Sequence, residues 1–260
     1  SYAGGYRAPQ AFDEDMHIAV VGGKRVRIRL ADDLKEERSH SVSLSADLYH
    51  NFGRVQTNLL VEGFYTILDD VFALRDLEDT DDGGKIKERY NGSGAAVRGF
   101  NVEGRAIFTR WFELQAGVTL QQSRDKEPEQ WSKDAEVPPV RRMFRTPDAY
   151  GYFTASFKPV RNFTADLTGT CTGSMLVQHM AGSGVAQDAA VSTPSFFDMN
   201  VRLSYDLRIS KEITLQLYGG VQNLFNAYQK DFDKGADRDS GYIYGPSLPR
   251  SWFVGAKFSF

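Results

Sequence analysis

The chain is built from nine segments in which apolar and polar residues alternate with a period of two. Successive side chains of a β-strand point to opposite faces, so this period predicts strands with one apolar and one polar face. The segments are residues 42–49, 58–67, 100–109, 112–121, 151–158, 163–172, 197–207, 213–222 and 252–260. The opening stretch through Tyr6 is a candidate tenth strand. An all-β fold is therefore predicted.

The connections between these segments alternate between short and long. The tight turns are residues 51–54, 110–111, 159–162 and 209–211, and the long connections are residues 8–38, 70–95, 124–147, 179–194 and 226–247. Short turns at one rim and long loops at the other are typical of an antiparallel up-and-down barrel. The short turns fall on the same side as the C-terminus, which in bacterial barrels is the periplasmic side.

The composition resembles that of a soluble protein, with 41% hydrophobic residues and a mean hydropathy of -0.41. No apolar run is long enough for a spanning helix. In a transmembrane barrel, however, lipid-facing and lumen-facing residues alternate, so their hydropathies cancel. A soluble sandwich also has alternating strands, but seldom strands this uniform with loops segregated by length. We therefore predict a transmembrane barrel in which Trp252, Val254, Phe258 and Phe260 form the C-terminal assembly strand.

Several classes of function lack support in the sequence. The net charge of -3 gives no basic signal for nucleic acid. Cys171 is the single cysteine, so the chain has neither an internal disulfide nor a cysteine-based metal site. No nucleotide-binding glycine loop, G-x-S-x-G or H-E-x-x-H motif occurs. No secretion signal is visible at the N-terminus, and we therefore expect a processed or partial chain.

Four stretches of the sequence match short motifs. Residues 5–9 (GYRAP) match a "G-F/Y-R-A-P" box, and residues 91–103 match an "N-x-G-x-A-x-x-x-G-x-E" strand. Residues 221–226 (VQNLFN) match a "V-x-N-L-F-N" strand end, and residues 245–250 (GPSLPR) match a "G-P-x-x-P-R" turn. Together these stretches resemble TonB-dependent outer-membrane receptors, in which the strand end precedes the last loop and the turn enters the last strand.

The resemblance implies a 22-stranded barrel with an N-terminal plug, of which residues 1–260 would be the C-terminal portion without the plug. It implies a bacterial outer-membrane receptor, not an enzyme, that imports a scarce nutrient and is energised by the TonB complex. Ferric siderophores and cobalamin-like chelates rank first as ligands, haem next and oligosaccharides last. The partners implied are outer-membrane lipid, the TonB complex, the receptor's own plug and a possible surface lipoprotein, with no nucleic acid.

Candidate ligand-binding residues lie on the outer loops. A basic patch and two loop histidines are the main features, because arginines bind anionic chelates or lipopolysaccharide phosphate and histidines ligate haem iron. The candidates are Arg7, His17, Arg141, Arg142, Arg145 and His179. His17 lies between two short sequence boxes, residues 5–9 and residues 32–35, a spacing that loosely resembles that of haem receptors. The second box departs from the haem-receptor pattern. A solvated loop histidine is the alternative.

Two acidic clusters are candidate calcium sites in the extracellular loops, because carboxylates at alternate positions suit hard cations. One is residues 78–83, and the other comprises Asp231, Asp233, Asp237 and Asp239. Neither has the full ligand pattern of a calcium loop, so solvated charge is the alternative. No cofactor is otherwise predicted.

Five charged residues in the middle of strands are predicted to line the lumen and face the plug: Glu103, Arg105, Asp166, Arg202 and Asp206. Two other functions remain open at this point. One is a self-contained ten-stranded barrel enzyme resembling an outer-membrane protease, with His179 and Asp188 activating water. The other is a surface adhesin. A ten-stranded barrel would pair its first and last strands, whereas a receptor fragment leaves both edges unpaired.

Overall fold

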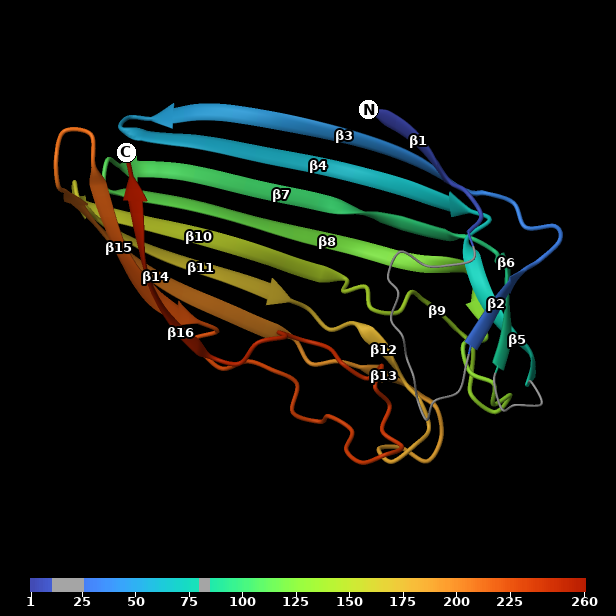
Figure 1. Cartoon of the computed structure of the whole chain (residues 1–260). Coiled ribbons are helices and arrows are strands. Elements are labelled where there is room, and N and C mark those ends of the chain that lie inside the picture. The colour runs from blue at the N-terminus through green and yellow to red at the C-terminus, as the bar shows by residue number, and fades with distance from the viewer. Residues whose placement is uncertain (11–25, 80–84) are drawn as a thin grey trace.

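The computed structural model describes residues 1–10, 26–79 and 85–260, and within them the chain is one large antiparallel sheet with smaller sheets at one end (Figure 1). In order across the sheet, its strands are β1 (Tyr2–Arg7), β3 (Glu37–Phe52), β4 (Val55–Asp69), β7 (Ala95–Thr109), β8 (Phe112–Glu129), β10 (Ala149–Val160), β11 (Phe163–Thr172), β14 (Phe196–Arg208), β15 (Thr214–Gln222) and β16 (Ser251–Ser259). The nine predicted strands and the tenth candidate are all present.

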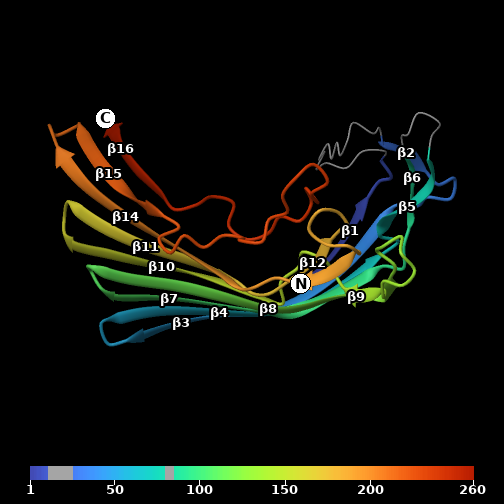
Figure 2. The same ribbon diagram turned by 90° about the horizontal axis from the view of Figure 1, so that it is seen from below.

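The sheet is curved into a trough, with the short turns at one end and the long connections at the other (Figure 2). Each strand pairs with its neighbours along the chain path, but β1 and β16, the two ends of that path, do not pair with each other. A self-contained ten-stranded barrel would close this seam. The trough is therefore an open part of a barrel wall.

The register aligns the apolar residues of all ten strands on one face. Val61, for example, stands opposite Val102, which in turn stands opposite Val118. On β3 this face is the exposed one: Leu44 is 81% exposed, whereas Ser43 beside it is half-buried. A soluble protein buries its apolar residues and exposes its polar ones, whereas here the apolar residues are the more exposed. This pattern matches a barrel wall whose outer face contacts lipid. No helix with the length and hydrophobicity to cross a bilayer occurs in the described part of the chain.

Aromatic rings gather on this apolar face near the short turns. Phe112 stacks on Phe108 and Phe157, with ring centroids 5.2 and 4.6 Å apart. Rings at this height suit the membrane–water interface of an outer-membrane barrel. The short-turn rim thus carries part of the aromatic girdle that the high phenylalanine and tyrosine content allows.

The long connections hold more structure than the sequence predicts. Residues 8–38 and 70–95 contribute β2 (Val26–Leu30), β5 (Phe72–Asp79) and β6 (Lys85–Asn91), which form a three-stranded sheet. Residues 176–192 form the hairpin β12 (Leu176–His179) and β13 (Ala189–Ser192), and β9 (Val140–Arg142) adds to β8. Since β2 pairs in parallel with the distant β6, no local pattern indicates this pairing. Only the last connection, residues 226–247, contains no strand, as predicted.

Candidate functional site at the outer rim

A small apolar core ties the hairpin β12–β13 to the last long loop at the outer rim. Val177 is fully buried, and Tyr242 and Tyr244 from the last loop pack with it at 3% and 7% exposure. Gln229 connects two parts of the same loop by hydrogen bonds. Its side-chain Nε2 donates to the Tyr242 carbonyl at 3.0 Å, and its Oε1 accepts from the Tyr244 N–H at 2.8 Å. The last loop is therefore folded on the hairpin.

His179 lies at the end of β12, inside this core, and does not project into solvent. Its ring stacks on Tyr242 with centroids 3.7 Å apart, and its Nε2 lies 2.9 and 3.0 Å from the two carboxylate oxygens of Asp233. Burial opposes ionisation of Asp233, but the hydrogen bonds from His179 and from the Asp239 N–H outweigh it and hold its pKa below the ordinary value. The sequence identified both residues but not that they meet.

Asp231 forms a second anchor in the last loop. The hydroxyls of Tyr242 and Tyr244 donate to its two oxygens at 2.8 and 2.6 Å. Burial works against its ionisation, yet these donors hold the pKa of Asp231 below its usual value. For Tyr242, burial first and then the carboxylate raise the pKa of the phenol. The two tyrosine hydroxyls thus hydrogen-bond both oxygens of a carboxylate that the sequence suggested as a cation ligand, and they favour its ionised form.

The four predicted calcium ligands do not converge on one point with free oxygens. Asp239 accepts hydrogen bonds from the Met180 and Gly241 N–H groups, both at 2.8 Å. Among the residues described, no group of three or more His, Cys, Asp or Glu side chains is placed to hold a metal ion. These contacts show what Asp231, Asp233 and Asp239 do within the loop. Calcium binding in the extracellular loops stays a prediction, and most of the other acidic cluster, residues 80–83, lies outside the described residues.

Two asparagines of the V-Q-N-L-F-N stretch hold the base of the last loop. Asn223 has a left-handed backbone (φ 49°) and is 3% exposed, and its amide donates to the carbonyls of Ala227 and Leu248, both at 2.9 Å. Asn226, also left-handed (φ 53°), accepts from the Arg250 N–H at 2.9 Å. Asparagine tolerates this backbone better than most residues. The motif therefore joins the two ends of the loop, a role that spacing alone did not reveal.

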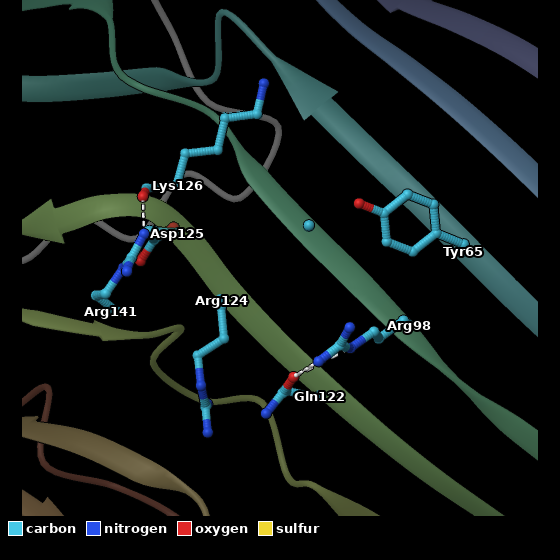
Figure 3. Close-up of a pocket in the computed structure, with 8 residues that line it drawn as sticks. Tyr65, Arg98, Gln122, Arg124, Asp125, Lys126 and Arg141 are labelled. Atoms are coloured by element: carbon cyan, nitrogen blue, oxygen red, sulfur yellow. Dashed lines mark hydrogen bonds between the residues drawn. The ribbon is translucent and has the colours of Figure 1, made fainter.

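The three arginines of the predicted basic patch have separate roles. Arg142 pairs with Asp148 at 3.0 Å and donates to the Ser174 carbonyl at 2.9 Å. Arg145, in a left-handed backbone, donates to the Gly241 and Ile243 carbonyls and so clamps the last loop. Arg141 is exposed and lines a cavity (Figure 3). The structure therefore does not bring the three together as one anion-binding patch.

The remaining outer candidates are His17 and Arg7. His17 lies outside the described residues. Arg7 ends β1, where it pairs with Glu37 at 3.3 Å and lies over the Phe72 ring at 5.1 Å. Arg7 thus connects β1 to the small sheet of the outer rim.

All five predicted lumen residues lie on the polar face of the sheet. Arg105 pairs with Glu113 at 2.6 Å, and Glu103 accepts from Gln115 at 2.7 Å. Asp166 accepts from Ser156 at 2.6 Å and stands opposite Arg202 in the register, while Asp206 accepts from Gln216 at 2.8 Å. Polar side chains thus hydrogen-bond along and across the strands on this face. Their contact with a plug stays a prediction.

A luminal pocket opens where this polar face meets the last loop. It has a cavity volume of about 240 Å³ and is lined by Thr170, Thr172, Met175, Asp198 and Phe196 among others. The Oδ1 atom of Asp198 is buried there without a hydrogen-bond partner in the structure. Gly245 turns the loop over the pocket with φ 85°, and a side chain there would clash with the Phe196 ring. The glycine of the G-P turn therefore allows this close approach.

The predicted assembly strand forms the free edge β16. Trp252, Val254 and Phe258 share the outer face and are 76%, 89% and 61% exposed, and Phe260 follows the strand. The strand pairs with β15 from Ser251 to Ser259. Its other edge has no strand beside it among the described residues, as a seam in a larger barrel requires.

Comparison with known proteins gives the same picture. The chain matches the family model described as TonB dependent receptor-like, beta-barrel, over residues 1–224. The ferric-catecholate import receptor Fiu from E. coli K12 superposes with a TM-score of 0.60 at 18% identity, covering 99% of this chain and 32% of the receptor. No curated protein matches the chain.

Two further solved structures have the same fold. The copper transporter OprC gives a TM-score of 0.63 at 13% identity over 100% of this chain and 36% of its own. The siderophore receptor PirA from Pseudomonas aeruginosa gives 0.62 at 12% identity over 99% of this chain and 38% of its own. The chain thus spans about a third of the length of the receptors it resembles.

An antiparallel meander with a lipid-type outer face and a polar inner face defines a part of an outer-membrane β-barrel. Since the family model covers most of the sequence, the chain belongs to the TonB-dependent receptor family. This family comprises outer-membrane transporters rather than enzymes.

Proposed function

We propose that this chain is the C-terminal part of the barrel of a receptor that imports a bulky metal chelate across the outer membrane, energised through TonB. A ferric siderophore or a cobalamin-like chelate is the cargo we place first, with haem next. Residues 1–260 supply the ten C-terminal strands and their outer loops. An N-terminal plug and the remaining strands complete the barrel and make contact with the TonB complex.

The observation that carries this proposal is the open trough itself. Its polar face is continuous across ten strands, and its two edges, β1 and β16, are unpaired within the described residues. Such a surface suits the wall of a wide, hydrated lumen around a plug. The structural relatives named for ferric-catecholate import, copper transport and siderophore reception support a metal-containing cargo.

The outer loops support a receptor rather than a passive pore. The core around Val177, Tyr242 and Tyr244 fixes the last loop over the mouth of the trough, next to the Asp198 pocket. A fixed loop presents the same groups to each arriving ligand, which lowers the ordering cost of binding. A surface lipoprotein cap remains compatible with these loops.

The enzyme alternative has no comparable support. His179 bonds to Asp233, and Asp188 accepts from the Ser132 hydroxyl at 2.6 Å and the Ala181 N–H at 2.7 Å. The two residues suggested for water activation thus have different partners. The adhesin alternative predicts that the full-length protein lacks a plug.

Uptake by cells that carry or lack the full-length gene tests the proposal. Cells would be starved of iron or cobalamin and given radiolabelled ferric siderophores, cobalamin or haem in parallel. We expect uptake of one chelate class to be lost both on deleting the gene and on removing TonB. Uptake of every chelate unchanged by the deletion, or a permeability that persists without TonB, would refute active import.

A further inference from the structure

The luminal pocket beneath the last loop contains a carboxylate that the rest of the structure does not use. Among the described residues that line this cavity of about 240 Å³, Asp198 is the one ionisable side chain. Its Oδ1 atom is buried, and the carboxylate makes no hydrogen bond or ion pair within the described part of the chain. A buried carboxylate oxygen without a donor is costly, so Asp198 favours a ligand that brings N–H or O–H groups.

Two threonine hydroxyls face the same pocket from the neighbouring strand. In the register of β11 and β14, Thr170 stands opposite Asp198 and Thr172 stands opposite Phe196, so these four side chains share the inner face. Both threonines line the cavity, and neither hydroxyl bonds to another of the residues that the structure describes. The pocket thus presents oxygen acceptors from three side chains, one of them a carboxylate.

The other walls of the pocket are largely apolar and are fixed by the backbone. Met175, Phe196 and Pro246 line it beside the three polar side chains. The Met175 N–H donates to the Thr193 hydroxyl at 3.1 Å, and the Thr193 N–H donates to the Met175 carbonyl at 2.9 Å. These bonds join the two ends of the hairpin segment at the pocket wall. A wall fixed in this way lowers the ordering cost of binding.

The position and size of the pocket limit what it can hold. Val201 and Val221 form the outermost pair between β14 and β15, so Asp198 lies beyond the paired part of β15, at the outer mouth of the trough. Sites that enclose a whole drug-sized ligand have volumes of roughly 300–1,000 Å³. This smaller pocket therefore suits one arm of a bulky ligand that arrives from outside.

The neighbouring bases are engaged elsewhere. Arg202, the next base on the inner face of β14, lies four residues further on, about 13 Å along the strand. Its guanidinium donates to Gln216 at 3.3 Å and lies 4.6 Å from the centre of the Tyr218 ring. Arg145 donates to two carbonyls of the last loop. A positive charge beside Asp198 is therefore best supplied by the ligand.

We propose that this pocket binds a protonated primary amine on an alkyl arm of the imported chelate, an inference that rests on the proposed function. An ammonium group has three N–H donors and no acceptor, which matches the Asp198 carboxylate and the hydroxyl oxygens of Thr170 and Thr172. Met175 and Phe196 contact the methylene groups of the arm. A neutral alcohol would leave the buried carboxylate without a counter-charge, and an anionic arm would be repelled.

Equilibrium binding to the full-length receptor in detergent tests this site. The probes are two forms of one chelate, taken from the class whose uptake requires the gene. One form carries a free aminobutyl arm, and in the other form that amine is acetylated, which removes the charge. The variant is Asp198→Asn, which keeps the size of the side chain. The control is Asp47→Asn, on the inner face near the short turns, where Asp47 accepts from the Tyr49 hydroxyl at 2.9 Å.

We expect the wild-type receptor to bind the aminobutyl chelate roughly tenfold more tightly than the acetylated form, because acetylation removes a charge-assisted contact with Asp198. Asp198→Asn should abolish this preference and leave the affinity for the acetylated form unchanged. Asp47→Asn should keep the preference. If Asp198→Asn fails to assemble, Thr170→Val removes one acceptor and should lower the preference about threefold.

Two results would overturn the assignment. One is equal affinity of the wild-type receptor for the two forms, and the other is equal weakening of both forms by Asp198→Asn. The second result would indicate that a basic side chain of the plug occupies the pocket. Both results would leave the uptake assay, and with it the proposed function, intact. Chelate uptake that does not depend on the gene would instead refute the proposed function and this site together.

Discussion

The transmembrane wall and the outer rim of this protein bury opposite kinds of residue. On the wall, Leu44 and Val254 are 81% and 89% exposed, while polar side chains bond to one another across the inner face. At the rim, Val177, Tyr242 and Tyr244 are buried as in a soluble domain. The difference follows from the solvent on each side: lipid covers the outer wall, and water surrounds the rim. One chain therefore follows two sets of burial rules.

The largest effect is expected from a charge placed on the lipid face. Leu48→Arg should destabilise the folded barrel by about 2–4 kcal/mol if Leu48 lies near the bilayer midplane. Urea titration of the full-length protein in lipid vesicles measures this free energy of unfolding. The matched control is Ser45→Arg, on the opposite face of the same strand and paired in register with Glu62. Equal losses for the two variants would show that the faces are misassigned.

A smaller, local effect is expected at the rim. His179→Leu removes the partner of the buried Asp233 carboxylate, so the last loop should open more often. We expect hydrogen exchange in residues 229–245 to accelerate roughly tenfold, because one charge-assisted bond is lost. His50→Leu, the same change at the short-turn rim, should leave this segment protected. Unchanged exchange in His179→Leu would show that the histidine does not hold the loop.

A third change separates the two anchors of the last loop. Tyr242→Phe removes one of the two hydroxyls that donate to Asp231 and should destabilise the rim by about 1 kcal/mol. Tyr228→Phe, which alters a 39% exposed ring of the same loop, serves as the control. Hydrogen exchange over the loop provides the measurement. If both variants behave alike, the contact with Asp231 does not stabilise the rim.

The smallest effect is expected from pH within the neutral range. The pKa values of Asp231 and Asp233 lie below their usual value of 3.8, so the stability that these carboxylates supply is fully present above that pH. It should be lost as the pH falls below 3.8 through their lowered pKa values. Near-ultraviolet circular dichroism of the tyrosines should therefore stay constant from about pH 8 to pH 5. A change in the tyrosine signal within that interval that is caused by protonation of Asp231 or Asp233 would contradict the assigned contacts.

The strands of the transmembrane wall could be predicted from the sequence because the pattern that specifies each strand lies within a short segment of the chain. The alternation in residues 197–207 or 252–260 reports both the strand and its faces, and the turn lengths report the meander. The rim could not be predicted in this way. The pairing of β2 with β6, and of His179 with Asp233, joins segments far apart in the chain, and no periodicity encodes either.

The same distinction between local patterns and long-range contacts applies to the predicted site residues. The five lumen residues lie on one face because strand parity places them there. The patch of Arg141, Arg142 and Arg145 is contiguous in sequence but not in space, because the left-handed Arg145 turns the chain toward the last loop.

The mass of the intact protein in purified outer membranes tests the central proposal most directly. The chain spans 32% to 38% of the receptors it resembles, so a part of such a receptor should come from a product of about three times 29.1 kDa. A product near 29.1 kDa, with β1 and β16 cross-linked to each other as neighbours, would contradict the account. It would mean that the trough closes on itself as a small barrel.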